Sequence, residues 1–235
     1  MRDLPFWYPP ILTYHRIHPT PSSETPTLSP EEFEKQMKLL SERWKPSRLS
    51  TLAGALEGKE HFPPRGVVVT FDDGTEDTYT HAFPILSQYR IPAAVFLIAG
   101  NVGKEGFVKP QQIARMDREG ITFGSHCLNH EYLPSLTPEQ AEYSILLSKK
   151  HLERLGIPVE FISFPGGGFT RQVIEAVQRA GYRAACTTNR GFRRFPVDRW
   201  ALRRVSIHSG AASRFGIWLR CCGYYGLNRR LRSPS

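Results

Sequence analysis

Two hydrophobic patterns alternate along this chain, one typical of buried strands and the other of amphipathic helices. Residues 66–71 (GVVVTF) and 93–99 (AAVFLIA) are continuous apolar runs, which indicates strands buried on both faces. Between residues 30 and 44, apolar side chains instead recur every three or four positions after Ser29, which predicts a helix with that serine as its N-cap. The same patterns predict further strands at residues 9–14, 121–124, 161–164, 182–186 and 202–207, and further helices at residues 75–89, 111–119, 137–155 and 170–180.

This alternation of strands and helices favours a parallel α/β architecture. A chain of 235 residues suggests one large domain or two small ones. About seven or eight strand–helix units fit an irregular (β/α) barrel better than an open sheet. We therefore expect a (β/α) barrel.

Charge is distributed unevenly. The chain has 31 Lys and Arg against 22 Asp and Glu, a formal net charge of +9. From Arg190 to the C-terminus, 11 Arg and one acid give +10, so the remainder carries −1. Nucleic-acid binding therefore ranks last, because the body lacks a basic stripe. The aromatic and basic residues 211–235 suit peripheral contact with an anionic membrane, or alternatively form a final helix packed on the barrel with a basic end.

Sequence features also bear on the compartment. Four irregularly spaced cysteines do not form a disulfide framework or a CxxC zinc motif. No segment reads as a signal peptide or a transmembrane helix. We expect a cytoplasmic or membrane-peripheral protein.

Two adjacent carboxylates, Asp72 and Asp73, directly follow the apolar run at residues 66–71, and Gly74 permits a tight turn after them. In parallel α/β folds, sites are built at the carboxyl ends of strands. Adjacent side chains diverge on an extended backbone, so one aspartate can ligate a metal while the other handles a proton. The alternative is a simple turn in which an aspartate caps the next helix.

A second motif follows the expected strand at residues 121–124. His126 and His130 are four positions apart, and on a helical turn this spacing places both imidazoles on one face. With one carboxylate from the acidic strand end, they provide the open three-ligand set of catalytic zinc or a similar divalent metal. Such a set leaves room for water, whose pKa the metal lowers toward ~7.

These motifs resemble one family. TFDDG at residues 70–74, followed by SHxxxH at residues 125–130, is similar to the polysaccharide deacetylases, the carbohydrate esterases with a NodB homology domain. The resemblance covers about residues 66–207, and YHRI at residues 14–17 is similar to a segment that precedes the catalytic domain in many members. It implies a deformed (β/α) barrel of the polysaccharide deacetylase type, with the catalytic domain at residues 64–210.

On this basis the chain divides into three parts. Residues 1–63 would form an N-terminal strand, loop and helix leading into the barrel. Residues 211–235 would form the basic aromatic tail.

The resemblance also implies roles for the motif residues. Asp73, His126 and His130 match the metal ligands, with zinc as the first candidate and cobalt, nickel or manganese as alternatives. Asp72 matches the general base that deprotonates the attacking water. That water would attack an N-acetyl carbonyl, and the metal would stabilise the tetrahedral oxyanion.

The third family motif, an Arg-Pro-Pro-Tyr-like strand end, is altered here. Ser163 stands at the arginine position and Gly166 at the aromatic position. The backbone N–H of Gly166 remains a candidate donor to the oxyanion. Arg204 is the candidate for the charge that orients Asp72, with a solvated surface arginine as the alternative.

The last family motifs are degraded. His208 is the candidate for the general acid of a terminal Leu-x-His motif, and a surface histidine is the alternative. If His208 is not the acid, protonated Asp72 could return its proton to the leaving amine. His15, at the end of the first expected strand, is a candidate to line the pocket.

The sequence therefore predicts a metal-dependent hydrolase that removes N-acetyl groups from an amino-sugar polysaccharide or oligosaccharide. The altered third motif leaves open a related hydrolase of a non-sugar amide. A catalytically silent protein that binds a glycan or a membrane is the alternative from another class.

Overall fold

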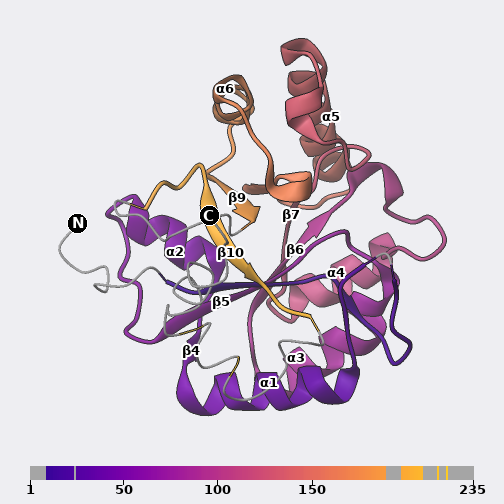
Figure 1. Ribbon diagram of the computed structural model, residues 1–235, viewed down its shortest axis with the longest axis vertical. Helices are drawn as coiled ribbons and strands as arrows, with labels where there is room; N and C mark the ends of the chain where they lie inside the picture. Colours follow the sequence, from indigo (N-terminus) through magenta and orange to yellow (C-terminus); the bar gives the residue numbers. More distant parts are fainter. Residues whose placement is uncertain (1–8, 24, 189–196, 209–215, 217–220, 222–235) are drawn as a thin grey trace, which may run out of the picture.

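Seven parallel strands close into a barrel in the computed structural model, which describes residues 9–23, 25–188, 197–208, 216 and 221 (Figure 1). The barrel closes because β1 pairs with β10 on one side and with β5 on the other. The predicted (β/α) barrel is thus confirmed. Around the barrel the strands follow the order β1 (Ile11–Tyr14), β10 (Leu202–Ser206), β9 (Ala184–Thr188), β8 (Phe161–Ser163), β7 (Thr122–Ser125), β6 (Ala93–Leu97) and β5 (Gly66–Phe71).

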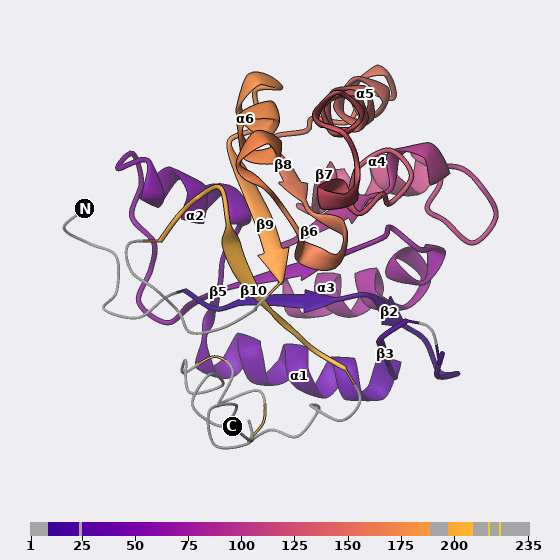
Figure 2. The same cartoon turned by 45° about the horizontal axis from the view of Figure 1, so that its top comes forward.

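Helices surround the barrel. In both overall views α1 and α3 lie together on one side, and α5 and α6 lie together on the other (Figures 1 and 2). Capping agrees with the sequence, because Ser29 caps the first of these helices and Thr137 forms a capping box at the start of α5. The helices are α1 (Pro30–Arg43), α2 (Leu49–Leu56), α3 (Phe83–Tyr89), α4 (Pro110–Arg118), α5 (Pro138–Arg154) and α6 (Arg171–Arg179).

Some elements differ from the sequence prediction. The helix expected from residue 75 begins with a π-helical turn, Thr78–Ala82, before α3. Strand β9 lies at Ala184–Thr188, two residues further along the chain than the predicted 182–186. Helix α2 was not predicted, and its N-cap Arg48 makes no side-chain capping bond that would mark its start. Three two-residue strands also went unpredicted: β2 (Arg16–Ile17), β3 (Thr27–Leu28) and β4 (Lys45–Pro46).

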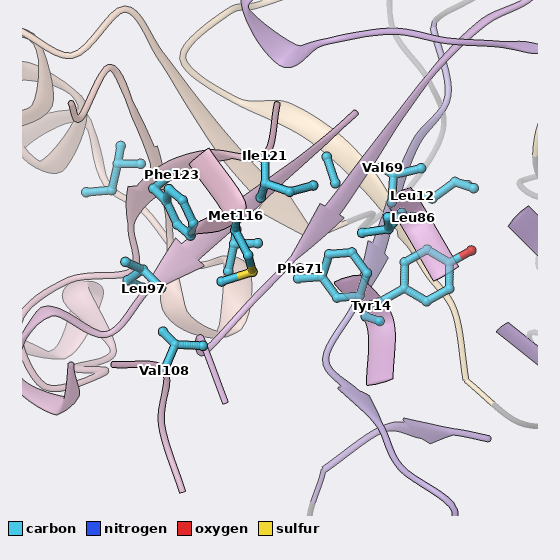
Figure 3. Packing of buried hydrophobic residues seen from close by; sticks show 14 of the residues in the cluster. Leu12, Tyr14, Val69, Phe71, Leu86, Leu97, Val108, Met116, Ile121 and Phe123 are labelled. Carbon is cyan, nitrogen blue, oxygen red and sulfur yellow. The ribbon is translucent and has the colours of Figure 1, made fainter. Parts of the chain in front are cut away.

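The outer faces of the strands form the larger core. Val69 and Phe71 of β5 pack with residues of the surrounding helices, among them Leu86 of α3 and Met116 of α4 (Figure 3). Because side chains alternate along a strand, the residues between them point into the barrel. The run of apolar residues in β5 therefore reflects burial on both faces.

The barrel interior is apolar toward the start of the strands and polar toward their ends. Ile11, Val68 and Leu202 belong to an inner cluster that also includes Leu52 of α2. Two residues further along the same strands, the inward positions carry Thr13, Thr70 and Arg204, all buried. This polar layer lies at the carboxyl ends of the strands, where the two aspartates and two histidines follow.

Candidate active site

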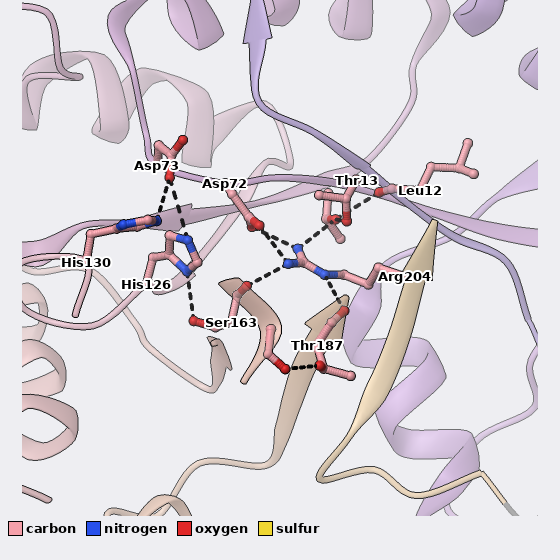
Figure 4. A network of polar contacts seen from close by, with 11 residues as sticks. Leu12, Thr13, Asp72, Asp73, His126, His130, Ser163, Thr187 and Arg204 are labelled. Atoms are coloured by element: carbon pink, nitrogen blue, oxygen red, sulfur yellow. Dashed lines mark hydrogen bonds and ion pairs between the residues drawn. The ribbon is translucent and has the colours of Figure 1, made fainter. Parts of the chain in front are cut away.

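The structure brings five sequence-predicted residues to one end of the barrel. Asp72 and Asp73 follow β5, His126 follows β7, and Arg204 lies on β10 (Figure 4). His130 joins them from the same loop as His126. Parallel strands deliver their carboxyl ends to a common edge, so residues from distant parts of the chain meet there.

The acidic pair sits on a sharply turned backbone. Asp73 has a φ of 71° and Gly74 a φ of 69°, both in the left-handed region. A Cβ on Gly74 would lie 2.5 Å from the Leu97 side chain, so both φ and the close approach favour glycine there. The turn directs the Asp72 carboxylate toward Arg204 and the Asp73 carboxylate toward the histidines (Figure 4).

The two histidines share a site without the expected helical turn. The segment after β7 is a non-helical turn in which Cys127 and His130 have φ values of 61° and 62°. The prediction of a helical turn was therefore wrong, yet the imidazole centroids of His126 and His130 lie 4.9 Å apart. The Glu131 carboxylate fastens this loop by accepting hydrogen bonds from a backbone N–H within it and from Ser144 of α5.

Asp73, His126 and His130 fit a divalent metal ion. Their candidate ligand atoms all lie within 4.8 Å of one another. Asp73 Oδ1 lies 3.6 Å from His126 Nε2 and 3.5 Å from His130 Nε2. Ligand atoms around a tetrahedral zinc, at bond lengths of about 2.0–2.2 Å, are separated by about 3.3–3.6 Å. Asp73 Oδ1 is also buried without a hydrogen-bond partner among the described residues, as expected of an atom that ligates a cation.

A hydrogen bond on the ring nitrogen that points away from Asp73 fixes the orientation of His126. Its Nδ1 lies 2.7 Å from the backbone carbonyl oxygen of Ser163. A carbonyl can only accept, so Nδ1 carries the proton. Nε2 is then unprotonated, and its lone pair lies on the side of Asp73. Burial lowers the pKa of His126 to about 4, against the opposing charge of Asp72, so this imidazole is neutral and able to ligate at neutral pH.

The two aspartates titrate in opposite directions. Burial and the neighbouring Asp72 charge raise the pKa of Asp73 to about 6 in the absence of a cation. Burial also acts to raise the pKa of Asp72. The positive charge and the hydrogen bonds of Arg204 outweigh burial, so the pKa of Asp72 lies below its usual range. Asp72 is therefore ionised at neutral pH.

Asp72 and Arg204 form a buried bidentate pair. Arg204 Nη1 donates to Asp72 Oδ1 at 2.8 Å, and Nη2 donates to Oδ2 at 2.6 Å. The two residues are 4% and 1% exposed, so little solvent weakens the interaction. The alternative of a solvated Arg204 is excluded by this burial.

All five N–H groups of Arg204 have acceptors. Besides Asp72, Nη1 donates to Thr70 Oγ1 at 3.2 Å, Nη2 to Ser163 Oγ at 2.7 Å, and Nε to the Thr187 carbonyl at 3.3 Å. By the sequence resemblance, Ser163 stands at the expected arginine position of the third family motif. The guanidinium of Arg204 thus reaches the Ser163 side chain from a different strand.

The glycine-rich turn after β8 borders this network. Gly166 and Gly167 have φ values of 62° and 71°, which favour glycine. Thr187 Oγ1 donates to the Gly167 carbonyl at 2.5 Å, while the Thr187 carbonyl accepts from Arg204. Thr187 therefore links the turn that carries Gly166 to the arginine that holds Asp72.

The two further histidines differ in their surroundings. His208 is exposed beyond the end of β10, and among the described residues no hydrogen bond or ion pair joins it to Asp72 or the metal-site residues. His15 is half-buried after β1, and its Nδ1 is buried without a hydrogen-bond partner in the described part of the chain. Tyr14 pairs with Phe71 where β1 runs beside β5, so His15 follows β1 at the same edge of the barrel where Asp72 follows β5.

Sequence reasoning missed the polar residues that support the site. Thr70, Ser163 and Thr187 each accept from Arg204 through a hydroxyl or carbonyl. Thr70 and Ser163 place their hydroxyls at inward positions near strand ends, where an apolar side chain would continue the buried run. That break in apolarity was the available signal.

Most of the expected tail at residues 211–235 lies outside the described residues. Of the two described positions, Cys221 is buried in the outer core. In the described part of the chain, no helix has both the length and the apolarity to cross a membrane. The described residues give no support to the predicted peripheral contact with an anionic membrane.

Known proteins resemble this chain in sequence and in fold. The model of the polysaccharide deacetylase family matches residues 59–185. YxkH of Bacillus subtilis (strain 168), named for the same family, is 30% identical over 213 residues, which are 89% of this chain and 75% of YxkH. The poly-beta-1,6-N-acetyl-D-glucosamine N-deacetylase of Staphylococcus aureus (strain MSSA476) is 38% identical over 93 residues, 39% of this chain and 31% of that protein. The structure of Streptococcus pyogenes deacetylase PplD in complex with acetate matches with a TM-score of 0.82 at 26% identity, covering 91% of this chain and 97% of that one.

Proposed function

The chain belongs to the polysaccharide deacetylase family, and on that premise we propose that it is a metal-dependent hydrolase that removes N-acetyl groups from an amino-sugar glycan. One observation carries the proposal: an open set of three metal ligands lies beside a buried, ionised carboxylate. Hydrolysis of an amide needs both an electrophile for the carbonyl and a base for water.

Asp73, His126 and His130 would hold the cation. Zinc, or cobalt, nickel or manganese in its place, supplies Lewis acidity there that polarises the acetamido carbonyl and makes water more acidic. His126 is suited to this role because its Ser163 contact fixes the neutral tautomer with Nε2 free.

Asp72 would accept the proton from the attacking water. Each carboxylate oxygen retains a lone pair after accepting one hydrogen bond from Arg204. Arg204 fixes the direction of that lone pair and keeps Asp72 ionised before the reaction. The backbone N–H of Gly166 remains the candidate donor to the oxyanion of the tetrahedral intermediate.

Collapse of the intermediate breaks the C–N bond, releases acetate and requires a proton on the leaving amine. Three groups are candidates for its delivery: protonated Asp72, His208 and His15. The buried Nδ1 of His15, at the strand edge that also carries Asp72, favours His15 over the exposed His208. Acetate release by His15→Ala and by His208→Ala separates the two histidines, since replacing the acid lowers the rate and replacing the other residue does not.

Two other functions remain as alternatives. A hydrolase of a non-sugar amide would use the same metal and base, and the altered third motif is the reason to consider it. A silent binding protein would not need the intact ligand set and the buried ion pair, so these features argue against it.

The test uses purified protein that is stripped of metal and reloaded with zinc or cobalt. Acetate release is measured on N-acetylglucosamine oligomers with β-1,4 and β-1,6 linkages and on an N-acetylated peptide. We expect release from a glycan, and a decrease of about 10²–10⁴-fold for Asp72→Asn with metal content unchanged. Asp117→Asn, which alters an exposed acid on α4, is the matched control.

Three results would count against the proposal. Full activity of Asp72→Asn would exclude Asp72 as the base. Release of acetate from the peptide alone would favour the non-sugar amide. Absence of bound metal in the wild-type protein would favour the silent binder.

A further inference from the structure

Tyr132 is an exposed aromatic residue at the edge of the candidate active site. It lies two residues after the metal-ligand candidate His130 and is 47% exposed, whereas the next residue, Leu133, is buried. The fold does not require an aromatic side chain in this position, because Leu133 already anchors the segment in the core. A tyrosine in this position offers a ligand an apolar ring together with a polar hydroxyl.

The Tyr132 ring lies against the glycine-rich turn that follows β8. A Cβ built on Gly166 would be 3.3 Å from Tyr132 Cδ2, and a Cβ on Gly168 would be 2.7 Å from both Cζ and Oη. One side of the ring therefore runs along the backbone of the turn. The same turn follows Ser163, which contacts both His126 and Arg204.

Gly168 differs from the two glycines before it. Gly166 and Gly167 have positive φ values, so their backbone conformation accounts for glycine there. Gly168 has φ −82° and ψ 141°, an ordinary extended conformation that any residue adopts. What excludes a side chain at Gly168 is the Tyr132 ring itself. The absence of a side chain at residue 168 thus allows Tyr132 to take its place.

We propose that Tyr132, seated on the Gly166–Gly168 turn, is a substrate-contacting residue that binds a pyranose ring of the acetylated glycan beside the reacting acetamido group. The inference rests on the proposed function. A ligand that reaches both the metal ligands and the Gly166 backbone passes Tyr132, which adjoins both. A pyranose ring has apolar C–H faces and hydroxyl edges, and tyrosine offers an apolar ring with a hydroxyl that donates and accepts.

The test separates binding from turnover by working in the Asp72→Asn background. Calorimetry with an N-acetylglucosamine tetramer in each linkage gives Kd for the parent and for added Tyr132→Ala, Tyr132→Leu and Gly168→Ala. We expect each to weaken binding of at least one oligomer roughly tenfold. Gly168→Ala is the sharpest variant, because its new methyl displaces the ring without changing the preferred backbone. Tyr143→Ala, at another exposed tyrosine (64%), is the matched control and should leave Kd unchanged.

A second readout uses enzymes with Asp72 intact. Tyr132→Ala should raise KM roughly tenfold and change kcat by less than about threefold, since the ring contacts the sugar and not the reacting atoms. Melting temperatures of all variants identify any that fail to fold, and Tyr132→Leu retains apolar packing on the turn if Tyr132→Ala does not fold.

The outcomes are distinct from those that test the proposed function. If Kd stays within about twofold of the parent for folded Tyr132 and Gly168 variants, or if no glycan binds, the inference is wrong. If Tyr143→Ala weakens binding as much, it is wrong as well. If the oligomers bind and the Tyr132 variants weaken them while wild-type protein releases no acetate, the sugar contact stands and the deacetylase activity does not.

Discussion

Asp72 and Asp73 are neighbours in the chain and stand in opposite surroundings. Both oxygens of Asp72 accept hydrogen bonds from Arg204 in the barrel interior. Asp73 faces the imidazoles of His126 and His130 and has a buried oxygen without a hydrogen-bond partner among the described residues. The pKa of Asp72 is therefore lowered and that of Asp73 is raised to about 6.

The difference shows how one dipeptide serves two purposes. Asp72 has its countercharge, Arg204, within the protein, so its negative charge is balanced before any ligand binds. Among the described residues Asp73 forms no ion pair with a lysine or arginine, so a bound cation would add the charge that stabilises it. The left-handed backbone of Asp73 separates the two carboxylates and makes this division possible.

The largest effect is expected from removing the countercharge of Asp72. Arg204→Met leaves a buried carboxylate unpaired and should lower the free energy of unfolding by about 3–5 kcal/mol in urea denaturation. Arg179→Met removes another bidentate pair, with Glu142, that is exposed to solvent, and should lower the free energy of unfolding far less. Equal losses for the two variants would contradict the importance that we attach to burial.

A double variant isolates the cause. Adding Asp72→Asn to Arg204→Met removes the unpaired charge, so the double variant should be more stable than Arg204→Met alone. Additive losses would show that the arginine acts by packing and not by charge compensation.

An effect of intermediate size is expected from replacing either aspartate by asparagine in metal-free protein, and the change in the free energy of unfolding should have opposite signs at the two positions. At about pH 7.5, Asp72→Asn should destabilise by about 2–3 kcal/mol, because a charged partner of Arg204 is lost. Asp73→Asn should stabilise by about 1–3 kcal/mol, because it removes a buried charge that has no countercharge. Urea denaturation in chelator measures both, and a destabilised Asp73→Asn protein would refute the contrast.

The pH dependence follows from the same shifts. The pKa of Asp73 is about 6 in the folded protein against 3.8 for the ordinary group, so the folded state binds more protons between these values. Its contribution therefore lowers the stability of metal-free protein as pH rises from about 4 to about 6. Asp72 has a lowered pKa, so its contribution is present above its ordinary pKa of 3.8 and is lost as the pH falls below it. Asp73→Asn should flatten the first slope and retain the second.

The smallest effect is expected at Ser163, which joins the two regions. Its hydroxyl accepts from Arg204, and its carbonyl contacts His126. Ser163→Ala removes only the hydroxyl and should cost about 1–2 kcal/mol while retaining metal affinity within about threefold. Metal titration followed by urea denaturation tests this, and a large loss of metal affinity would show that the two regions are coupled through Ser163.

Much of the fold and of the candidate metal site could be predicted because both depend on local sequence. Continuous apolar runs such as residues 66–71 mark strands buried on both faces, and Asp72, Asp73, His126 and His130 stand next to such strands. Their proximity follows from parallel strand order and did not require the loop conformation. The helical turn expected for the histidines was wrong for this reason: the spacing is compatible with more than one backbone path.

The remainder depends on contacts that no local pattern records. Ser163 and Thr187 acquire their roles only when β10 places Arg204 between β5, β8 and β9. The fit between Tyr132 and Gly168 joins residues from two loops, and glycine at an ordinary φ carries no signal in a single sequence. Such relations appear only in three dimensions.

The closure of the barrel also determines when the active site comes into existence during synthesis. Asp72 and Arg204 are 132 residues apart, and β10 is the last described strand to leave the ribosome. Contacts of such separation form late, since a long loop must close before they stabilise anything. An emerging chain can therefore gather its cation ligands while the carboxylate beside them still lacks its arginine. The proposed hydrolytic activity would thereby be tied to completion of the whole fold, and a chain interrupted before residue 204 should remain inert.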